Sequence, residues 1–270
     1  MTQFIKTRTI EGITTEIINE SGLDKHQSNP LVRHARGLAA QISKIEATQN
    51  DGLKRTLLPY AQGAALDALA DTYYRDLNNN PILRKDAETD VQYRERLRLS
   101  RKGYGIGTLD AYTFYATSAH ELLNTDNTLA FSPSPMEIEI GFIVEDGRNS
   151  EVKQAIETYL VEFTASGDRI VATPATVTNF DMDMDVYIHQ QSAFDPVRHL
   201  AQLKQNIKDH CALKRRIGGD VSEYGVLHAA GAGLAPYISR IVLNGWSDVV
   251  CAGNRFPELK TLAVHIYDET

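Results

Sequence analysis

Apolar residues recur at helical spacing through the first part of the chain. Asn29-Pro30 is a helix start, because Asn offers a capping side chain and Pro has a preset φ and no amide proton to lose. The apolar residues that follow stand four or three positions apart, which places them on one face of a helix. They are Leu31, Ala35, Leu38, Ile42 and Ile45. This helix is predicted to end near Asn50-Asp51-Gly52, and the helical stretch after it is interrupted at Pro59.

Three further helices are predicted before residue 125. The first carries Leu66, Leu69 and Tyr73 on one face. The second opens at Thr89-Asp90-Val91-Gln92, a capping box in which the Thr and Gln side chains satisfy each other's backbone amides. The glycines of the run 103–107 end it. Thr108 then caps the third helix, which is predicted to run to about Leu123.

The pattern changes from helical spacing to strict alternation at Met136. Every second residue from Met136 to Val144 is apolar, which predicts a half-buried strand. A helix over Val152–Phe163 and an extended run at Ile170–Ala172 then complete a β-α-β unit. A longer alternation follows and predicts a second strand, whose apolar face runs from Phe180 to Ile188 and whose other face carries Asp181, Asp183 and Asp185.

The remaining residues predict two helices and two strands. Asp195-Pro196 starts a helix, and Ser222 caps a shorter one that stops at Gly231. Strands are predicted at Tyr237–Leu243 and Thr261–Tyr267. The residues expected to face inward from the first of these helices are Val197, Leu200, Leu203, Ile207 and Cys211.

Together these elements predict an α+β fold, in which a helical N-terminal half precedes two small α+β units with mixed or antiparallel sheets. The expected domains are a largely helical region over residues 1–130, a β-α-β domain over 131–178 and a C-terminal α+β domain over 179–270. Ser132-Pro133-Ser134-Pro135 has the composition of a hinge between the first two.

Composition narrows the class of protein. The 270 residues are 42% hydrophobic and 23% charged, which is typical of folded globular proteins. The two cysteines, Cys211 and Cys251, exclude a disulfide scaffold and favour a reducing compartment. The sequence has neither a signal-peptide pattern nor a run of ~20 apolar residues, so we expect a soluble protein that does not enter a membrane.

The sequence predicts no catalytic, cofactor-binding or metal-binding residue. The glycine-rich run 103–107 follows a helix rather than a strand and lacks the Lys-Ser or Lys-Thr of a phosphate loop. The alternating carboxylates of 181–185 lack the Gly turn and the later Glu of a calcium loop. We interpret them as a solvated strand face, or as one side of a contact with a basic partner. An enzyme whose active site is assembled from distant residues remains an alternative function.

The helix that follows Thr89 has the highest local density of positive charge in the chain. Its cations are Arg94, Arg96, Arg98, Arg101 and Lys102. They are expected to cover most of its exposed circumference and to leave Tyr93, Leu97 and Ser100 facing inward. Such a helix suits nucleic-acid binding, which is a second alternative, but the net charge of −7 favours pairing with acidic neighbours in this chain or a partner.

Several runs of residues have a recognisable order along the chain. They are Gly63-Ala64-Ala65-Leu66-Asp67-Ala68-Leu69-Ala70 with Tyr73, Glu88-Thr89-Asp90 with Tyr93-Arg94 and Arg96-Leu97, and Gly107-Thr108-Leu109-Asp110-Ala111-Tyr112. Asp168–Pro174 and Arg216–Val221 follow them. This ordered set resembles the baseplate J-like family, the wedge proteins of contractile phage tails and related injection machines. The chain departs from the family at Tyr74-Arg75, where members usually have Gly-Val. It also has Pro135-Met136 where Pro-Gly often precedes the strand.

The resemblance implies a protein that has no active site and no cofactor and that works by assembly. Family members form wedges around a central hub, commonly with two copies in each wedge, clamped to a second wedge protein by a bundle of helices. The stripe at Leu31, Leu38, Ile42 and Ile45 and the helix at Leu66–Tyr73 would supply faces of that bundle. The expected partners are other wedge proteins, sheath-initiator-type proteins and hub proteins. The expected location is the tail baseplate of a virion that is assembled in the cytoplasm of a bacterial host.

Overall fold

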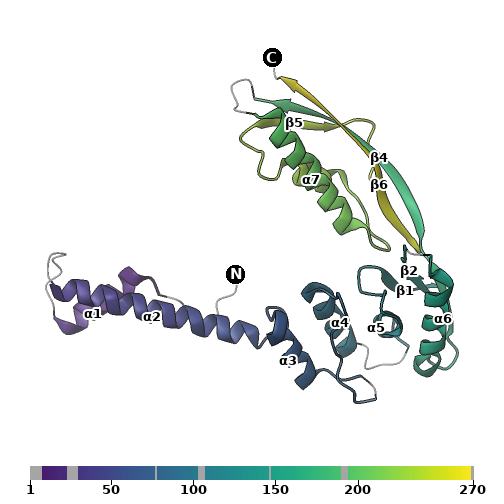
Figure 1. The fold of residues 1–270 in the computed structure, drawn as a ribbon, viewed down its shortest axis with the longest axis horizontal. Coiled ribbons are helices and arrows are strands. Elements are labelled where there is room, and N and C mark those ends of the chain that lie inside the picture. The colour runs from purple at the N-terminus through teal and green to yellow at the C-terminus, as the bar shows by residue number, and fades with distance from the viewer. Residues whose placement is uncertain are drawn as a thin grey trace. The chain divides into compact units, whose positions relative to one another are not determined.

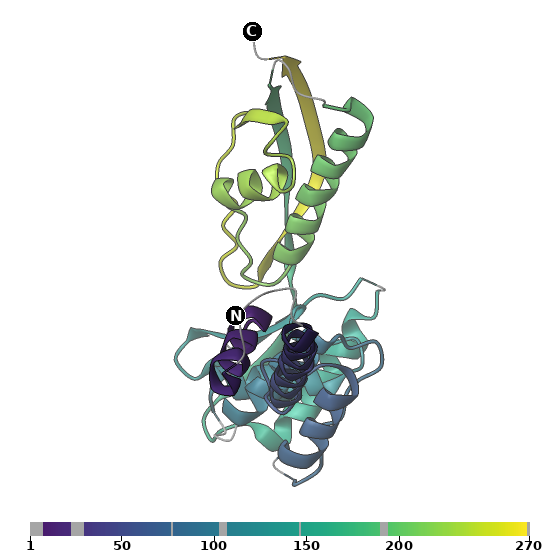
Figure 2. The same ribbon diagram turned by 90° about the vertical axis from the view of Figure 1, so that its left-hand side faces the viewer.

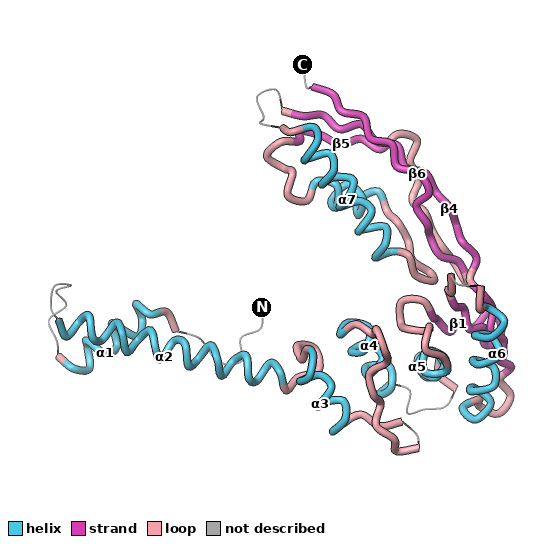
Figure 3. Tube along the Cα trace, viewed as in Figure 1, coloured by secondary structure: helices cyan, strands magenta, loops and turns pink. Residues whose placement is uncertain are grey.

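The computed structural model of the chain describes residues 8–22, 30–76, 78–102, 107–145, 147–189 and 194–268 (Figure 1). Within these residues it has eight α-helices and six strands, and every strand lies after residue 127 (Figure 3). The six strands form two mixed sheets, so the predicted α+β class is confirmed. The chain divides into two compact units, residues 1–84 and 85–270.

The first unit is helical and begins with a helix that the sequence analysis missed. Helix α1 spans Ile10–Ser21 and packs along α2, which spans Pro30–Arg55 (Figure 1). The Thr9 hydroxyl caps α1 by accepting a hydrogen bond from the amide of Gly12 at 3.1 Å. Helix α3 spans Gly63–Tyr73.

Helix α2 is longer than predicted, because it continues through Asn50-Asp51-Gly52 to Arg55. The predicted end at these residues is therefore wrong. One Gly inside a helix costs only about 1 kcal/mol, and the side chain of Asn50 is buried rather than free to compete for the backbone. The Asn29 cap lies outside the described residues.

The second unit opens with two helices, α4 over Asp90–Lys102 and α5 over Leu109–Ala119. The predicted capping box is confirmed: the amide of Thr89 donates to Gln92 Oε1 at 3.1 Å, and the amide of Gln92 donates to Thr89 Oγ1 at 3.3 Å. Thr108 caps α5 as predicted, through a hydrogen bond from the amide of Ala111 at 3.1 Å. The helix ends before Leu123, contrary to the prediction, because His120 is already extended.

The first sheet has the order β1-β2-β3, with β1 at Thr128–Ser134, β2 at Glu137–Phe142 and β3 at Arg169–Pro174. Strands β2 and β3 are parallel and are connected through α6, Asn149–Leu160, and a short 3₁₀ turn, which confirms the predicted β-α-β unit. The antiparallel strand β1 was not predicted.

The segment Ser132–Pro135, expected to be a hinge, contains the end of β1 and the start of a tight turn to β2. In this turn Met136 has φ +65°, the left-handed conformation that a non-glycine residue seldom adopts. Since the segment joins two strands of one sheet, it is not a linker between domains. The expected domain boundary at 130/131 falls inside β1.

The second sheet has β4, Thr176–Ile188, at its centre. Strand β5, Ile238–Leu243, pairs with it antiparallel on one side, and β6, Arg255–Asp268, pairs parallel on the other. Helices α7, Pro196–Lys214, and α8, Glu223–Gly231, pack on one face of this sheet, as Figure 2 shows for α7. The predicted order β-α-α-β-β is confirmed.

The caps of α7 and α8 and most of the inward face of α7 are as predicted. Asp195 accepts from the amides of Val197 and Arg198, and Ser222 accepts from the amide of Gly225. One inward residue was wrong: Val197 is 83% exposed. The buried row on α7 is His199, Leu203, Ile207 and Cys211, and Val197 lies roughly 200° around the helix from His199.

The two sheets of the second unit are tied together at Asn254. Its Nδ2 donates to Glu139 Oε1 at 3.0 Å and to the carbonyl oxygen of Thr173 at 3.1 Å. Gly141 on β2 makes room for this side chain, since a Cβ there would stand 2.3 Å from Asn254 Oδ1. Asn254, which lies between β5 and β6, therefore connects the second sheet to the first through these hydrogen bonds.

Candidate interaction surfaces

The longest helix of the first unit has an exposed apolar face. Leu31, Leu38 and Ile45 are 55%, 43% and 56% exposed, and their seven-residue spacing places them on one side of α2. The neighbouring side is covered, because Val32, Ala35 and Ala39 are buried where α1 packs. Ile42 lies between the two sides and is half-buried. We call Leu31, Leu38 and Ile45 the α2 seam.

Ion pairs hold the start of α1 against α2. Arg8 Nη2 lies 2.7 Å from Glu46 Oε1, and the backbone amide of Arg8 donates to Glu46 Oε2 at 3.0 Å. Arg8 also contacts Glu16 of α1 at 2.8 Å. The hydrogen bond from the Arg8 backbone, followed by that from its side chain, lowers the pKa of Glu46. These contacts fix α1 beside the seam rather than over it.

Helix α3 offers less free apolar surface than predicted. Leu66 is fully buried and Leu69 is half-buried, whereas Tyr73 is 65% exposed. The expectation that the whole Leu66–Tyr73 face is open to another chain is therefore wrong for Leu66. Asp67 accepts a hydrogen bond from Arg84 Nε at 2.8 Å, and Gly63 begins α3 with φ +50°.

One cation of helix α4 is buried, whereas the sequence predicted all five cations on its exposed surface. Arg96 is buried and donates from Nε to Glu88 Oε1 at 2.8 Å and from Nη2 to Glu88 Oε2 at 2.7 Å. A carboxylate eight residues earlier thus compensates this cation. Tyr93, Leu97 and Ser100 face inward as predicted.

The other cations of α4 differ in exposure. Arg94 is half-buried, while Arg98 and Arg101 are exposed, and the side chain of Lys102 lies outside the described residues. Since Arg96 is committed to Glu88, the density of exposed positive charge on α4 is lower than the sequence predicted.

Lys85 connects this ion pair to the end of α5. Its ammonium group donates to the carbonyl oxygens of Thr117, His120 and Leu123, the last two at 2.9 and 3.1 Å. Burial, with a smaller effect of the nearby Arg96 charge, lowers the pKa of Lys85 to about 8. The group acts as a cap for the carbonyl end of the helix.

Two of the runs that carry the family resemblance contact each other. Tyr112 donates its hydroxyl hydrogen to Asp168 Oδ2 at 2.6 Å and accepts from the amide of Ala165 at 3.0 Å. Gly107 has φ +94°, and a Cβ at this position would come within 3.0 Å of Ala165 Cβ. Gly103 and Gly105 lie outside the described residues.

The carboxylates of β4 lie on the sheet face opposite α7, as the alternation predicted. Thr261 Oγ1 donates to Asp181 Oδ1 at 2.5 Å, and His265 Nε2 lies 3.1 Å from Asp183 Oδ1. Neighbouring strand residues thus contact two of the three carboxylates. Within the described ranges, no group of three or more His, Cys, Asp or Glu side chains is arranged to hold a metal ion.

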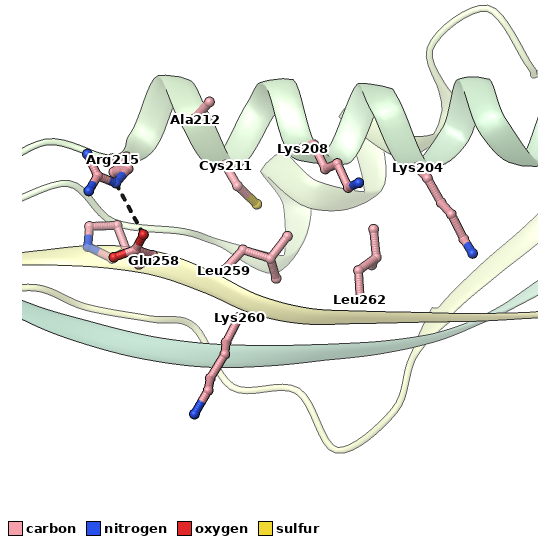
Figure 4. A pocket seen from close by; sticks show the side chains of 10 residues that line it. Lys204, Lys208, Cys211, Ala212, Arg215, Glu258, Leu259, Lys260 and Leu262 are labelled. Atoms are coloured by element: carbon pink, nitrogen blue, oxygen red, sulfur yellow. Dashed lines mark ion pairs between the residues drawn. The ribbon is translucent and has the colours of Figure 1, made fainter. Parts of the chain in front are cut away.

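A groove that sequence reasoning missed runs between α7 and the start of β6 and has a volume of about 490 Å³. Its lining includes Lys204, Lys208 and Cys211 of α7 and Leu259 and Leu262 of β6 (Figure 4). The only local signal in the sequence is the four-residue spacing of the two lysines, which places them one helical turn apart. Burial raises the pKa of the Cys211 thiol to about 11, which disfavours the nucleophilic thiolate.

Two further observations bear on the class of protein. No helix in the described part of the chain has both the length and the apolar character needed to cross a membrane. No model of a known protein family matches the sequence, and no curated protein matches it.

Proposed function

We propose that this chain is a structural wedge protein of a contractile-tail baseplate. In this role it assembles with a second wedge protein and neighbouring wedges around the hub and links the baseplate to the sheath. Two copies per wedge, contacts with sheath-initiator-type and hub proteins, and a location in the virion belong to the same proposal. Its support is the ordered set of sequence motifs together with the exposed seam of α2.

The α2 seam is the observation that carries the proposal. The helix has 26 residues and is therefore about 39 Å long at 1.5 Å per residue. Apolar side chains at seven-residue intervals along a helix pack into the holes of a facing helix. Leu38 and Ile45 are separated by one such interval and are both exposed, because α1 packs on the neighbouring side of α2. The surface suits burial by a helix of another subunit.

The contact between Tyr112 and Asp168 supports the same proposal from the second unit. The two residues lie in separate runs of the family resemblance, 56 positions apart in sequence. If the fold of the family requires both runs, residues of the two runs should contact each other, and this short hydrogen bond is such a contact. The runs therefore behave as parts of one packed unit.

The test compares seam and control variants in assembly. The seam variant Leu38→Glu with Ile45→Glu adds two charges where a partner helix would pack. The control variant Ala40→Glu with Ala47→Glu adds the same charges to exposed positions roughly 200° around the helix from the seam. Light scattering coupled to size exclusion gives the mass of each protein, alone and when co-expressed with the products of neighbouring genes.

We expect the wild-type chain and the control variant to self-associate or to form a stable complex with a neighbouring gene product. The seam variant is expected to form neither assembly. Electron microscopy of tailed particles from the same source should place the chain in the baseplate. A monomer that binds none of these products, or particles without the chain, would contradict the proposal.

A further inference from the structure

Among the described strands, one edge of β6 has no strand paired to it. The strand has 14 residues and pairs only with β4, from Thr176 opposite Arg255 to Ile188 opposite Asp268. The carbonyl of Arg255 accepts from the amide of Gly218 at 2.8 Å. From Phe256 to Asp268, no other segment in the described ranges hydrogen-bonds to the backbone of β6. The amides and carbonyls that point away from β4 are therefore available to another strand.

Over Thr261–Tyr267 this edge lacks the features that usually keep edge strands from pairing. Natural edge strands are guarded by Pro, by charged residues such as Lys or by bulges. Between Thr261 and Tyr267 the strand contains no Pro, Gly, Lys, Arg, Asp or Glu. Its one irregularity precedes this stretch, where the register shifts between Leu259 and Thr261 and leaves Lys260 as the extra residue.

The bulge at Lys260 shapes the groove beside the edge. Leu259 stands opposite Phe180 and Leu262 opposite Met182, so both leucines face α7 although three positions separate them. Figure 4 shows their side chains directed toward Cys211 and the helix, whereas Lys260 points to the other side of the sheet. The groove therefore has an apolar floor that is continuous with the free edge.

The helical wall of the groove is positively charged. Lys204 and Lys208 lie one turn apart on α7 and line the groove. Within the part of the chain that the structure describes, neither lysine has a carboxylate within ion-pair distance. Two other cations line the groove. Arg215 is already paired, since it lies 2.7 Å from Glu145 and 3.6 Å from Glu258, and Lys260 points to the other side of the sheet. Although the chain has a net charge of −7, these two lysines form a local site that can bind a negatively charged group.

We propose that an extended acidic segment of another protein binds here by adding a strand to the free edge of β6. Its backbone would pair with β6 from Leu259 to Tyr267, which is the mode of recognition known as β-strand addition. Its apolar side chains would lie on Leu259 and Leu262, and its carboxylates would contact Lys204 and Lys208. Charge complementarity selects an acidic segment, and the unpaired edge selects an extended one. The inference does not depend on the role proposed for α2.

The test uses three nine-residue peptides with the full-length protein. The first, called the Glu-Val peptide, repeats Val-Ser-Glu-Ser, so that its Val and Glu side chains all lie on one face of the strand. The second has Lys in place of every Glu, and the third repeats the first with all backbone amides N-methylated. We expect the first peptide alone to bind and to slow hydrogen exchange of β6 amides between Leu259 and Tyr267. The lysine peptide lacks the negative charge, and the methylated peptide keeps the negative charge but cannot donate backbone hydrogen bonds.

A pair of protein variants tests the charge requirement. The double variant Lys204→Glu with Lys208→Glu reverses the charge of the helical wall of the groove. We expect it to weaken binding of the Glu-Val peptide by about tenfold or more, because two attractive contacts become repulsive. Arg198→Glu changes a charge on the same helix outside the groove and is expected to leave affinity within about twofold. Circular dichroism of each variant checks that the helices are intact.

Several results would overturn the proposal. The first is no binding of the Glu-Val peptide at millimolar concentration to the wild-type protein. The second is equal binding of the lysine or the methylated peptide. If single-stranded DNA bound as tightly as the Glu-Val peptide and gave no protection of β6, the lysines would form a general anion site rather than a strand-addition site.

Discussion

The guanidinium of Arg96 donates two hydrogen bonds, at 2.8 and 2.7 Å, to the carboxylate of Glu88, and both side chains are almost wholly buried. The backbone amide of Lys85 donates to the same carboxylate at 3.0 Å. The Arg96 guanidinium carbon also lies 5.2 Å from the centroid of the Tyr93 ring. The pair therefore joins the middle of α4 to the loop before the helix, and a charge that sequence reasoning assigned to the surface belongs to the interior.

Arg96→Met should destabilise the protein strongly. It removes one partner of a buried ion pair and leaves the Glu88 carboxylate uncompensated, which typically costs about 3–5 kcal/mol. Arg98→Met is the matched control, because Arg98 is on the same helix, is exposed and lies 3.6 Å from Glu95, a surface pair expected to contribute under about 1 kcal/mol. Urea unfolding of the three proteins measures the difference. Equal losses in the two variants would show that Arg96 is not held as described.

Acid should abolish the contribution of Glu88. Burial alone would raise the pKa of Glu88, but hydrogen bonds from Arg96 and the Lys85 backbone outweigh it and lower the pKa below its ordinary value of 4.5. Stability from a carboxyl with a lowered pKa is complete above the unfolded-state pKa and is lost as the pH falls through the folded-state pKa. The difference in unfolding free energy between wild type and Glu88→Gln should be constant near neutral pH and shrink below pH 4.5. A difference that does not depend on pH would contradict this pairing.

Lys85 should titrate far below an ordinary lysine. Burial lowers its pKa from 10.5 to about 8, so between these two values the unfolded chain binds more protons than the folded one. Stability from this group therefore rises with pH across that interval. Nuclear magnetic resonance of the Lys85 side-chain carbon next to the amine should give a midpoint about 8. Lys85→Met identifies the signal, and a midpoint near 10.5 would show that the amine is solvated.

The sequence predicted those features of the fold that depend on neighbouring residues. The capping box at Thr89 and Gln92 and the caps at Asp195 and Ser222 were found because each involves residues no more than three positions apart. The β4 alternation was found because burial on one face leaves a period of two in the sequence. Strand β1 was missed because its last residues, Ser-Pro-Ser, have the composition of a loop.

The candidate sites were harder to predict because they depend on distant residues. Nothing near Arg96 in the sequence indicates that Glu88 lies against it, so a residue that is buried was assigned to the exposed face of the helix. The groove needs α7 and β6, which are separated by forty residues. The seam of α2 was predicted because its spacing is local, but only the packing of α1 shows which part of the helix remains exposed.

Gly141→Ala should loosen the joint between the two sheets of the second unit. The new Cβ would stand 2.3 Å from Asn254 Oδ1 and 3.1 Å from Ile217 Cδ1, so side chains must shift, at a typical cost of about 1–3 kcal/mol. Asn254→Ala removes the hydrogen bonds to Glu139 and to the Thr173 carbonyl but clears the space. The double variant should therefore lose less stability than the sum of the two single variants in thermal or urea unfolding. Additive losses would mean that Gly141 and Asn254 do not meet, and that the two sheets are held together elsewhere.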